Sequence, residues 1–287
     1  MRRASGAGRA AARRAGTPAA VVVAAALLLA LFSGDVSAQA PQRVVSLDLC
    51  TDWLLARYAP RGHVAALSPL SRQWPVEGLD SSWPAHDGTL EHILQLKPDL
   101  VLAGQFNAPQ LRSRLQSLGV RVEVLPLPDH LDGIAGYERR LLGLLGLPAD
   151  GVEDEPVPPA PSTSGRRLLL LGANGIGTGR GTLEDDILRR AGWTNYLRDE
   201  GYLALDLERL VADPPDAILW AAPASPALAN RFAVHPALRR ATPAPRWLAT
   251  DTWRWQCPGP WTWNLVRQLR DELIRLPSSG PQTGARP

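Results

Sequence analysis

The chain has 287 residues and a formal net charge of +3 at pH 7. Five arginines lie within its first 14 residues, so removal of residues 1–40, which also contain Asp35, changes the net charge to about −1. The basic charge therefore belongs to the N-terminus, and we expect no nucleic-acid partner for the rest of the chain.

The N-terminus is predicted to be a secretory signal peptide. Its arginines precede an apolar run over residues 19–32, and small residues follow in two A-x-A-like patterns, at Val36–Ala38 and Ala38–Ala40. This order is typical of a cleaved export signal. The alternative is a membrane anchor, but the apolar run has 14 residues, whereas a membrane span needs about 20. We therefore expect residues 1–40 to be removed on export.

The first half of the exported chain alternates short apolar strands with helices. The expected strands cover residues 44–47, 63–67, 99–104 and 120–125, and the expected helices cover residues 52–58, 89–96 and 109–118. Thr89 is a suitable N-cap, and the strand over residues 99–104 has the continuous apolar character expected in a parallel sheet. This alternation predicts a doubly wound N-terminal lobe over residues 42–130.

A second lobe is predicted after a connecting region. An amphipathic helix over residues 132–147 is followed by a segment with five prolines, so we interpret residues 131–165 as a bridging helix and a Pro-rich connector. The alternation restarts over residues 166–277, and residues 278–287 are expected to be a loose tail. The predicted fold class is α/β, with two doubly wound Rossmann-like lobes bridged by a helix and a ligand cleft between them.

The most recognisable motif is Thr89–Val101, which reads TLEHILQLKPDLV. This segment resembles the class III substrate-binding proteins of ABC importers, which carry vitamin B12, ferric siderophores or haem. Arg43–Leu47 and Ala191–Asn195 are similar to other parts of that family's pattern. The resemblance implies a monomeric periplasmic protein that binds a metal chelate or corrinoid, has no cofactor and is not an enzyme. The prolines after Leu147 depart from the family's long bridging helix.

The resemblance also implies a partner, an ABC permease in the inner membrane. The family docks on its permease through two surface glutamates, one in each lobe, which by position are Glu91 and Glu208 here. The alternative is that each is an ordinary glutamate in the first turn of a helix, where the helix dipole favours a negative charge.

The ligand site is expected in the loops that follow the strands, because open α/β sheets bind ligands at the carboxyl ends of their strands. The candidate ligand-binding residues of the first lobe are Cys50, Thr51, Arg72, Trp74, Gln105 and Asn107. Those of the second lobe are Asn174, Arg180, Trp253, Trp255, Cys257 and Trp261. Tryptophans would offer rigid faces to a large flat ligand, and arginines would bind its carboxylates. The alternatives are core tryptophans and solvated surface arginines.

The two cysteines leave three interpretations open. Cys50 and Cys257 each fall in a predicted loop after a strand, one in each lobe. They could form a disulfide between the lobes, act as thiolate ligands of a metal or metal chelate, or be unrelated buried residues. The five histidines show no close metal-ligand spacing, and the glycine-rich segment Gly175–Gly181 lacks the third glycine of a dinucleotide-binding motif.

Two other functions remain as alternatives at this point. The first is a secreted α/β enzyme that uses Cys50 or Cys257 as a nucleophile, although the chain has neither a G-x-S-x-G nor a C-x-x-C motif. The second is a module that docks a partner protein through its tryptophan-rich loop, residues 251–263.

Overall fold

The computed structural model describes residues 39–74, 79–152, 165–221, 231–250 and 252–276. The described residues from Ala40 onward belong to one compact unit. The predicted signal peptide, the middle of the Pro-rich connector and the predicted tail lie outside the described residues. The boundaries proposed for these segments therefore stay predictions. Within the described residues, no helix combines the length and apolar character that a membrane span requires.

The first half of the unit is built on a parallel four-stranded sheet in the order β2-β1-β3-β4. Its strands are β1 (Val44–Ser46), β2 (Val64–Ala66), β3 (Leu100–Gly104) and β4 (Val122–Leu125). The central strands β1 and β3 are buried along their whole length. This burial on both faces explains why their sequences are continuously apolar rather than alternating.

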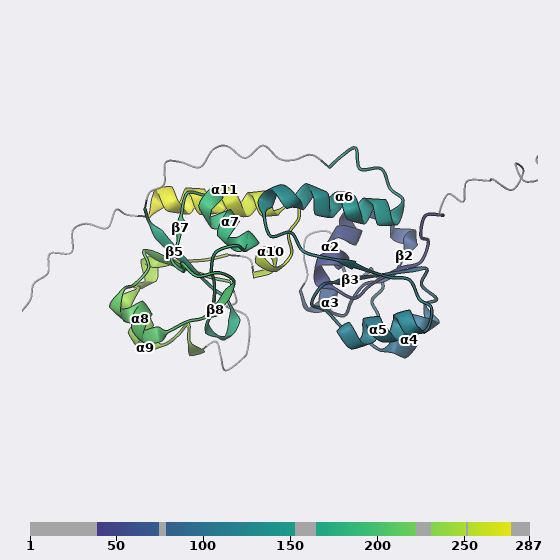
Figure 1. Ribbon diagram of the computed structural model, residues 1–287, viewed down its shortest axis with the longest axis horizontal. Coiled ribbons are helices and arrows are strands. Elements are labelled where there is room, and N and C mark those ends of the chain that lie inside the picture. The colour runs from purple at the N-terminus through teal and green to yellow at the C-terminus, as the bar shows by residue number, and fades with distance from the viewer. Residues whose placement is uncertain (1–38, 75–78, 153–164, 222–230, 251, 277–287) are drawn as a thin grey trace, which may run out of the picture. The chain divides into compact units, whose positions relative to one another are not determined.

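Helices cover both faces of this sheet, as the doubly wound prediction requires (Figure 1). Helices α2 (Leu49–Tyr58) and α6 (Ile134–Leu145) pack with Leu100 and Leu102 on one face. Helices α4 (Leu90–Gln95) and α5 (Pro109–Ser117) pack with Val101 and Ala103 on the other. Thr89 caps α4 as predicted, because its hydroxyl accepts a hydrogen bond from the backbone N–H of His92. The short helices η1 (Arg61–His63) and α3 (Leu70–Gln73) flank β2.

The second half is built on a six-stranded mixed sheet in the order β10-β9-β5-β6-β8, with β7 also paired to β5. Its strands are β5 (Arg167–Leu171), β6 (Ile176–Thr178), β7 (Thr194–Asn195), β8 (Tyr202–Ala204), β9 (Ala217–Trp220) and β10 (Trp247–Leu248). Strand β5 runs parallel to β9 and antiparallel to β6.

The glycine-rich segment Gly175–Gly181 contains strand β6. Two of its glycines allow close packing: a Cβ on Gly177 would lie 2.5 Å from a methyl group of Leu197, and one on Gly179 would lie 2.1 Å from the carbonyl oxygen of Asp199. At these two positions the missing side chain lets neighbouring segments of the chain approach, which explains both glycines without a phosphate-binding role.

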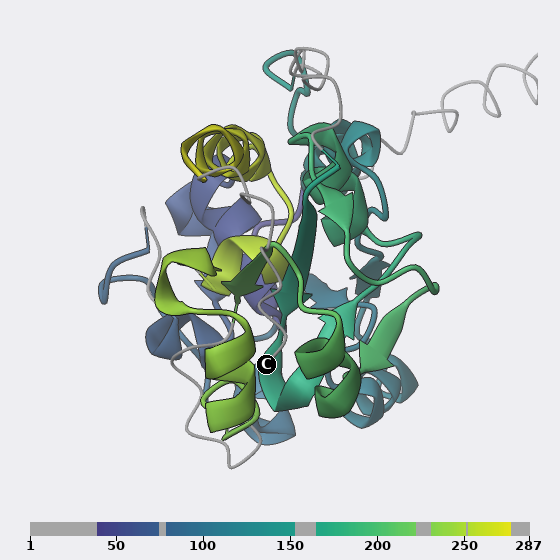
Figure 2. The ribbon, with the colours of Figure 1, turned by 90° about the vertical axis from the view of Figure 1, so that its left-hand side faces the viewer.

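Helices also cover both faces of the second sheet. Helices α7 (Leu183–Arg190) and α11 (Thr262–Arg275) pack on one face, and α8 (Leu207–Ala212) and α9 (Pro236–Ala241) pack on the other. Figure 2 views the yellow helix α11 close to its axis. The remaining helices are η2 (Leu131–Gly133), η3 (Ala173–Gly175), η5 (Ala244–Arg246) and α10 (Thr252–Gln256).

Helix α6 bridges the two halves, because its two ends belong to different cores. Ile134 at its start packs in the core of the second half, together with Leu131 of the preceding helix η2, whereas Tyr137, Leu141 and Leu145 pack in the core of the first. The helix is shorter than the predicted residues 132–147 and ends at Gly146, which adopts the left-handed conformation typical of a helix C-terminus.

Candidate ligand-binding site

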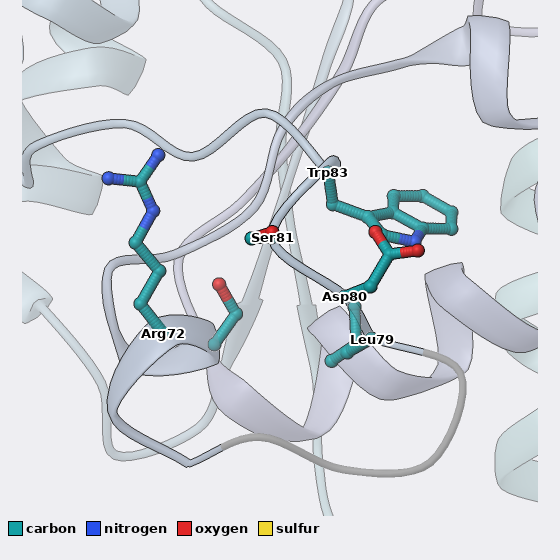
Figure 3. A pocket seen from close by; sticks show the side chains of 6 residues that line it. Arg72, Leu79, Asp80, Ser81 and Trp83 are labelled. Carbon is teal, nitrogen blue, oxygen red and sulfur yellow. The ribbon is translucent and has the colours of Figure 1, made fainter.

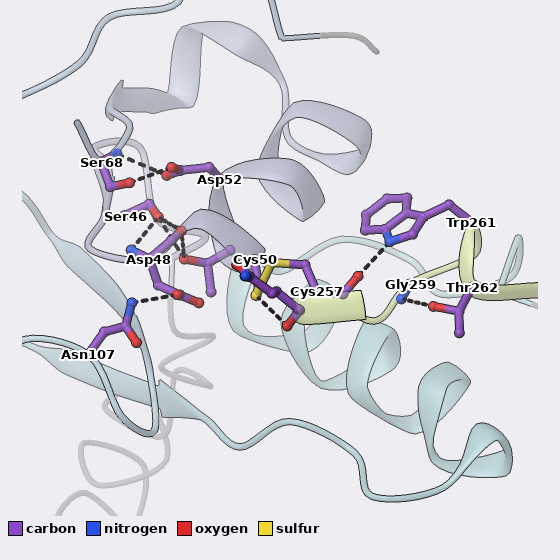
Figure 4. The surroundings of a disulfide bond; sticks show 12 residues. Ser46, Asp48, Cys50, Asp52, Ser68, Asn107, Cys257, Gly259, Trp261 and Thr262 are labelled. Atoms are coloured by element: carbon purple, nitrogen blue, oxygen red, sulfur yellow. Dashed lines mark hydrogen bonds between the residues drawn. A yellow bond between two sulfur atoms is a disulfide. The ribbon is translucent and has the colours of Figure 1, made fainter. Parts of the chain in front are cut away.

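The turn after β1 is held by a buried polar network (Figure 4). The hydroxyls of Ser46 and Thr51 lie 2.6 Å apart, and each donates a hydrogen bond to the backbone carbonyl of Asp48 at 2.9 Å. Thr51 is completely buried. The prediction that Thr51 contacts the ligand is therefore wrong: its hydroxyl instead secures the start of α2.

A buried carboxyl group ties α2 to the loop after β2. One oxygen of Asp52 accepts a hydrogen bond from the backbone N–H of Ser68 at 2.9 Å, and the other lies 2.6 Å from the Ser68 hydroxyl. Desolvation by burial raises the pKa of Asp52 to about 7, although the hydrogen bonds from Ser68 oppose this shift. Asp52 is fully buried, so its function is to fix the loop after β2 rather than to touch a ligand.

His86 attaches a third loop, the one that precedes α4, to the same network of hydrogen bonds. Its Nε2 lies 2.8 Å from the carbonyl oxygen of Ser46, and its Nδ1 accepts a hydrogen bond from the backbone N–H of Gly88 at 2.9 Å. These partners require Nε2 to carry the proton and Nδ1 to be free of one. Burial lowers the pKa of His86, which favours this neutral form.

The turn after β3 is hydrogen-bonded to Asp48 and carries an exposed aromatic ring. The side-chain amide of Asn107 donates a hydrogen bond to Asp48 Oδ1 at 2.7 Å, and Arg112 donates to the carbonyls of Gly104 and Gln105 at 3.1 and 3.3 Å. Gln105 and Asn107 are half-buried, whereas Phe106 is 77 % exposed. The turn is thus fixed at both ends while it holds a phenyl ring in solvent.

Phe106 was not among the residues predicted from the sequence. It lies between two residues that were predicted, Gln105 and Asn107, in a loop already selected by its position after a strand. Its aromatic character was the available signal, because a large apolar side chain in a loop at the ligand edge is a candidate contact surface.

Gly104 is expected to tolerate no side chain. A Cβ at this position would lie 2.8 Å from Asp48 Oδ2, a buried oxygen that accepts no hydrogen bond from any described residue. We expect Gly104→Ala to lower the free energy of unfolding by about 1–3 kcal/mol, as overpacking commonly does. Urea denaturation measures this loss, with Gly62→Ala as the control because a Cβ on Gly62 meets nothing within 4 Å. Equal stability of the two variants would contradict the prediction.

A pocket of about 420 Å³ opens beside the loop after β2 (Figure 3). It is lined by Ser71, Arg72, Leu79, Asp80, Ser81 and Trp83. Figure 3 shows Arg72 on one side of the pocket and Asp80 and Trp83 on the other.

The two sides of this pocket differ in how their charges are paired. Arg61 lies over the ring of Trp83, 4.9 Å from its centroid, and forms an ion pair with Asp80 at 3.6 Å. Arg72 is exposed, and its guanidinium makes no recorded ion pair or hydrogen bond within the described part of the chain. The guanidinium of Arg72 is therefore accessible, and its binding to an anionic ligand group stays a prediction. Trp74 is half-buried against the core of the first half.

Two predicted residues of the second half remain accessible. Asn174 is exposed in the turn after β5, where it adopts a left-handed conformation that asparagine tolerates well. Arg180 is also exposed, and its backbone N–H donates to the carbonyl of Asp199 at 2.8 Å. The structure brings neither of them into contact with the residues around Asp48.

The tryptophans of the loop before α11 do not form an open aromatic face. Trp255 is 5 % exposed in the core of the second half, and its indole N–H donates to the hydroxyl of Thr250 at 2.6 Å. Trp261 packs edge-on against Trp53, with ring centroids 5.5 Å apart. The burial of Trp255 speaks against its predicted role as a ligand contact, whereas Trp261 is partly exposed and its contact with a ligand stays a prediction. The side chain of Trp253 lies outside the described residues.

The two cysteines form a disulfide bond (Figure 4). Both are buried, at 6 % exposure for Cys50 and 1 % for Cys257. Cys50 also lies within α2 rather than in a loop, because the helix begins at Leu49 instead of the predicted Asp52. A disulfide has no thiolate, so the predictions of a metal ligand and of a catalytic thiol are wrong for this oxidised form, and the predicted contact of the two cysteines with a ligand stays a prediction. Elsewhere in the described chain, no three His, Cys, Asp or Glu side chains gather as a metal site would require.

The two candidate permease-docking glutamates occupy equivalent positions. Glu91 lies in the first turn of α4 and Glu208 in the first turn of α8, and both are exposed. Each helix has a polar N-cap, which is Thr89 for α4 and Asp206 for α8. The positions suit either interpretation, so the docking role stays a prediction.

No family model and no curated protein sequence matches the chain significantly. Several solved structures, however, are similar to it over most of its length. A periplasmic heme-binding protein of Pseudomonas aeruginosa is 24 % identical, with a TM-score of 0.62, over 84 % of this chain and 94 % of that one. A possible iron-binding, periplasmic solute-binding protein of Staphylococcus epidermidis is 16 % identical, with a TM-score of 0.63, over 83 % and 100 %. A periplasmic vitamin B12 binding protein of Vibrio cholerae is 19 % identical, with a TM-score of 0.57, over 82 % and 97 %.

The described residues therefore have the two-lobed α/β fold of the class III periplasmic substrate-binding proteins, with helix α6 joining the lobes. The fold class predicted from the sequence is confirmed. The similar structures named above are binding proteins rather than enzymes.

Proposed function

We propose that this protein is a periplasmic solute-binding protein that captures a metal chelate or corrinoid-type ligand and delivers it to an ABC importer. The observation that carries the proposal is the fold, which matches nearly the whole length of heme-, iron- and vitamin B12-binding proteins. The polar network around Asp48 supports it, because it pre-organises three turns at the edge of the first sheet where ligands of open α/β sheets bind.

The same proposal covers export, the partner and the absence of catalysis. Residues 1–40 act as a signal peptide that directs the protein to the periplasm, where it works as a monomer. Glu91 and Glu208 meet basic residues of the permease. The protein does no chemistry on its ligand, and the buried disulfide supports this part because it leaves no thiol nucleophile.

The ligand contacts in the first lobe follow from exposure and charge. Arg72 binds an anionic group, such as a carboxylate, from one side of its pocket. Phe106 offers a flat apolar face to the ligand. The turn that carries it is already held by the hydrogen bond from Asn107 to Asp48, so little conformational entropy is lost on binding.

The test of this function is a ligand panel. The full chain is exported to a bacterial periplasm, purified, and titrated with cobalamin, cobinamide, haem, ferric siderophores and simple metal salts. Saturable quenching of tryptophan fluorescence and a higher melting temperature with one chelate class is the expected result, because a ligand that binds only the folded state stabilises it. No response to any chelate would overturn the proposal.

Two substitutions test the proposed contacts with whichever chelate binds in the panel. We expect Arg72→Gln and Phe106→Ala each to weaken binding about tenfold or more, the loss typical of one good contact. The matched controls are Arg114→Gln and Leu118→Ala, which change an exposed arginine and an exposed leucine at the far end of α5. Equal affinity of the test and control variants in calorimetric titrations would remove these residues from the site.

A further inference from the structure

The segment between α10 and α11 leaves one core and enters the other. Trp255 before it and Trp263 after it pack in the core of the second half. Between them, Cys257 is part of the core of the first half, and Trp261 packs against that core. Residues 257–261, which we call the bracket, therefore cross between the halves independently of helix α6.

The bracket is anchored by a covalent bond and by ring packing. Cys257 is joined to Cys50 of α2. Trp261 meets Trp53 of the same helix edge-on, with an angle of 81° between the rings. Both partners lie on the first two turns of α2. The two anchors thus bind the bracket to one rigid element of the first half.

The bracket is also stiff within itself. The indole N–H of Trp261 donates to the carbonyl of Cys257 at 2.6 Å, and the backbone N–H of Gly259 donates to the hydroxyl of Thr262 at 3.1 Å. A Cβ on Gly259 would lie 2.5 Å from the ring of Trp261, so the ring folds back onto the glycine. A short, folded connection of this kind has little slack between its two ends.

The bracket is attached at the edge of the first sheet where a ligand is expected. Cys50 follows β1 by four residues and lies two residues after Asp48, at the carboxyl end of the first sheet. Cys257 comes after β10 and helix α10, the last elements of the second half before α11. The disulfide therefore attaches this segment at the carboxyl edge of the first sheet, where ligands of open α/β sheets bind.

We propose that the Cys50–Cys257 bracket is a second, covalent connection between the lobes that limits how far their ligand-binding edges separate. Two-lobed binding proteins open and close about a hinge. With helix α6 alone, the lobes could twist and bend about that helix. With a second attachment, the lobes can mainly rotate about an axis that passes through helix α6 and the bracket. The ligand-binding edges of the two lobes therefore stay, without ligand, close to the distance that they have when ligand is bound.

The test measures the separation of the lobes without any ligand, so its outcome does not depend on the proposed function. Ketone-bearing residues for spin labelling replace Leu118 in the first half and Tyr202 in the second, both of which are exposed. Pulsed electron resonance then gives the distribution of distances between the labels. We expect this distribution to widen about twofold or more in Cys50→Ala/Cys257→Ala, because the lobes regain hinge freedom. Trp261→Ala, which keeps the disulfide, should widen it less.

An unchanged width in the double alanine variant would overturn the proposal. Near-ultraviolet circular dichroism first checks that the variant is folded, and wild-type protein reduced by a phosphine provides an independent sample with native side chains. If both samples lose their tertiary signal, the disulfide is required by the core of the first lobe itself, and its role as a limit on lobe separation is rejected.

Discussion

Replacing both Cys50 and Cys257 by alanine should lower the free energy of unfolding by on the order of 5 kcal/mol. The disulfide joins residues 207 positions apart, so it restricts most of the unfolded chain. Cross-links that close long loops remove the most conformational entropy from the unfolded state. The two sulfur atoms are also buried, so alanine leaves unfilled space in the core of the first half.

Guanidinium denaturation, followed by tryptophan fluorescence and far-ultraviolet circular dichroism, measures this loss. The matched control is the reductant: it should lower the midpoint of the wild-type protein and leave that of the double alanine variant unchanged. A difference below about 1 kcal/mol between the oxidised protein and the variant would mean that the disulfide hardly constrains the unfolded chain.

Asp52 should make the protein less stable as the pH rises from about 4 to 7. Its pKa is raised by burial from 3.8 to about 7, so the folded state binds a proton more readily than the unfolded state. The favourable contribution is fully present below pH 3.8 and is lost as the pH rises through the folded pKa. By linkage this loss amounts to roughly 4 kcal/mol at most. The pKa of Asp48 is also raised by burial, so Asp48 acts in the same direction.

Asp52→Asn isolates this contribution. The asparagine oxygen can accept from the backbone N–H of Ser68, and its amide can donate to the Ser68 hydroxyl, so the loop after β2 stays tied to α2. The lowered pKa of His86 acts in the opposite direction, because it costs stability as the pH falls below 6.5. It is present in both proteins and cancels in their difference. Urea denaturation at half-unit pH intervals should show that the free energy of unfolding of the variant rises relative to that of the wild type between pH 4 and 7. Parallel curves of free energy against pH would refute the raised pKa of Asp52.

The sequence alone was sufficient for the elements that local chemistry controls. The apolar runs that became β1 and β3 indicate strands buried on both faces, and the expected helix over residues 89–96 is observed as α4, capped by Thr89. The alternation of these elements predicted two α/β lobes, and the rule on strand ends selected the loops that hold Arg72 and Asn107. These inferences succeed because burial and capping depend on residues that are close together in the chain.

Only the tertiary structure decided how distant residues combine. The sequence could not tell whether Cys50 and Cys257 pair, because a separation of 207 positions leaves no local signal of their approach. Trp255 and Trp261 have the polar neighbours of a loop, yet one packs in each core, whereas Phe106, in an equally polar context, stays exposed. The physical reason is that an aromatic ring packs or stays in solvent according to the surfaces that the fold places beside it, and those surfaces come from other parts of the chain.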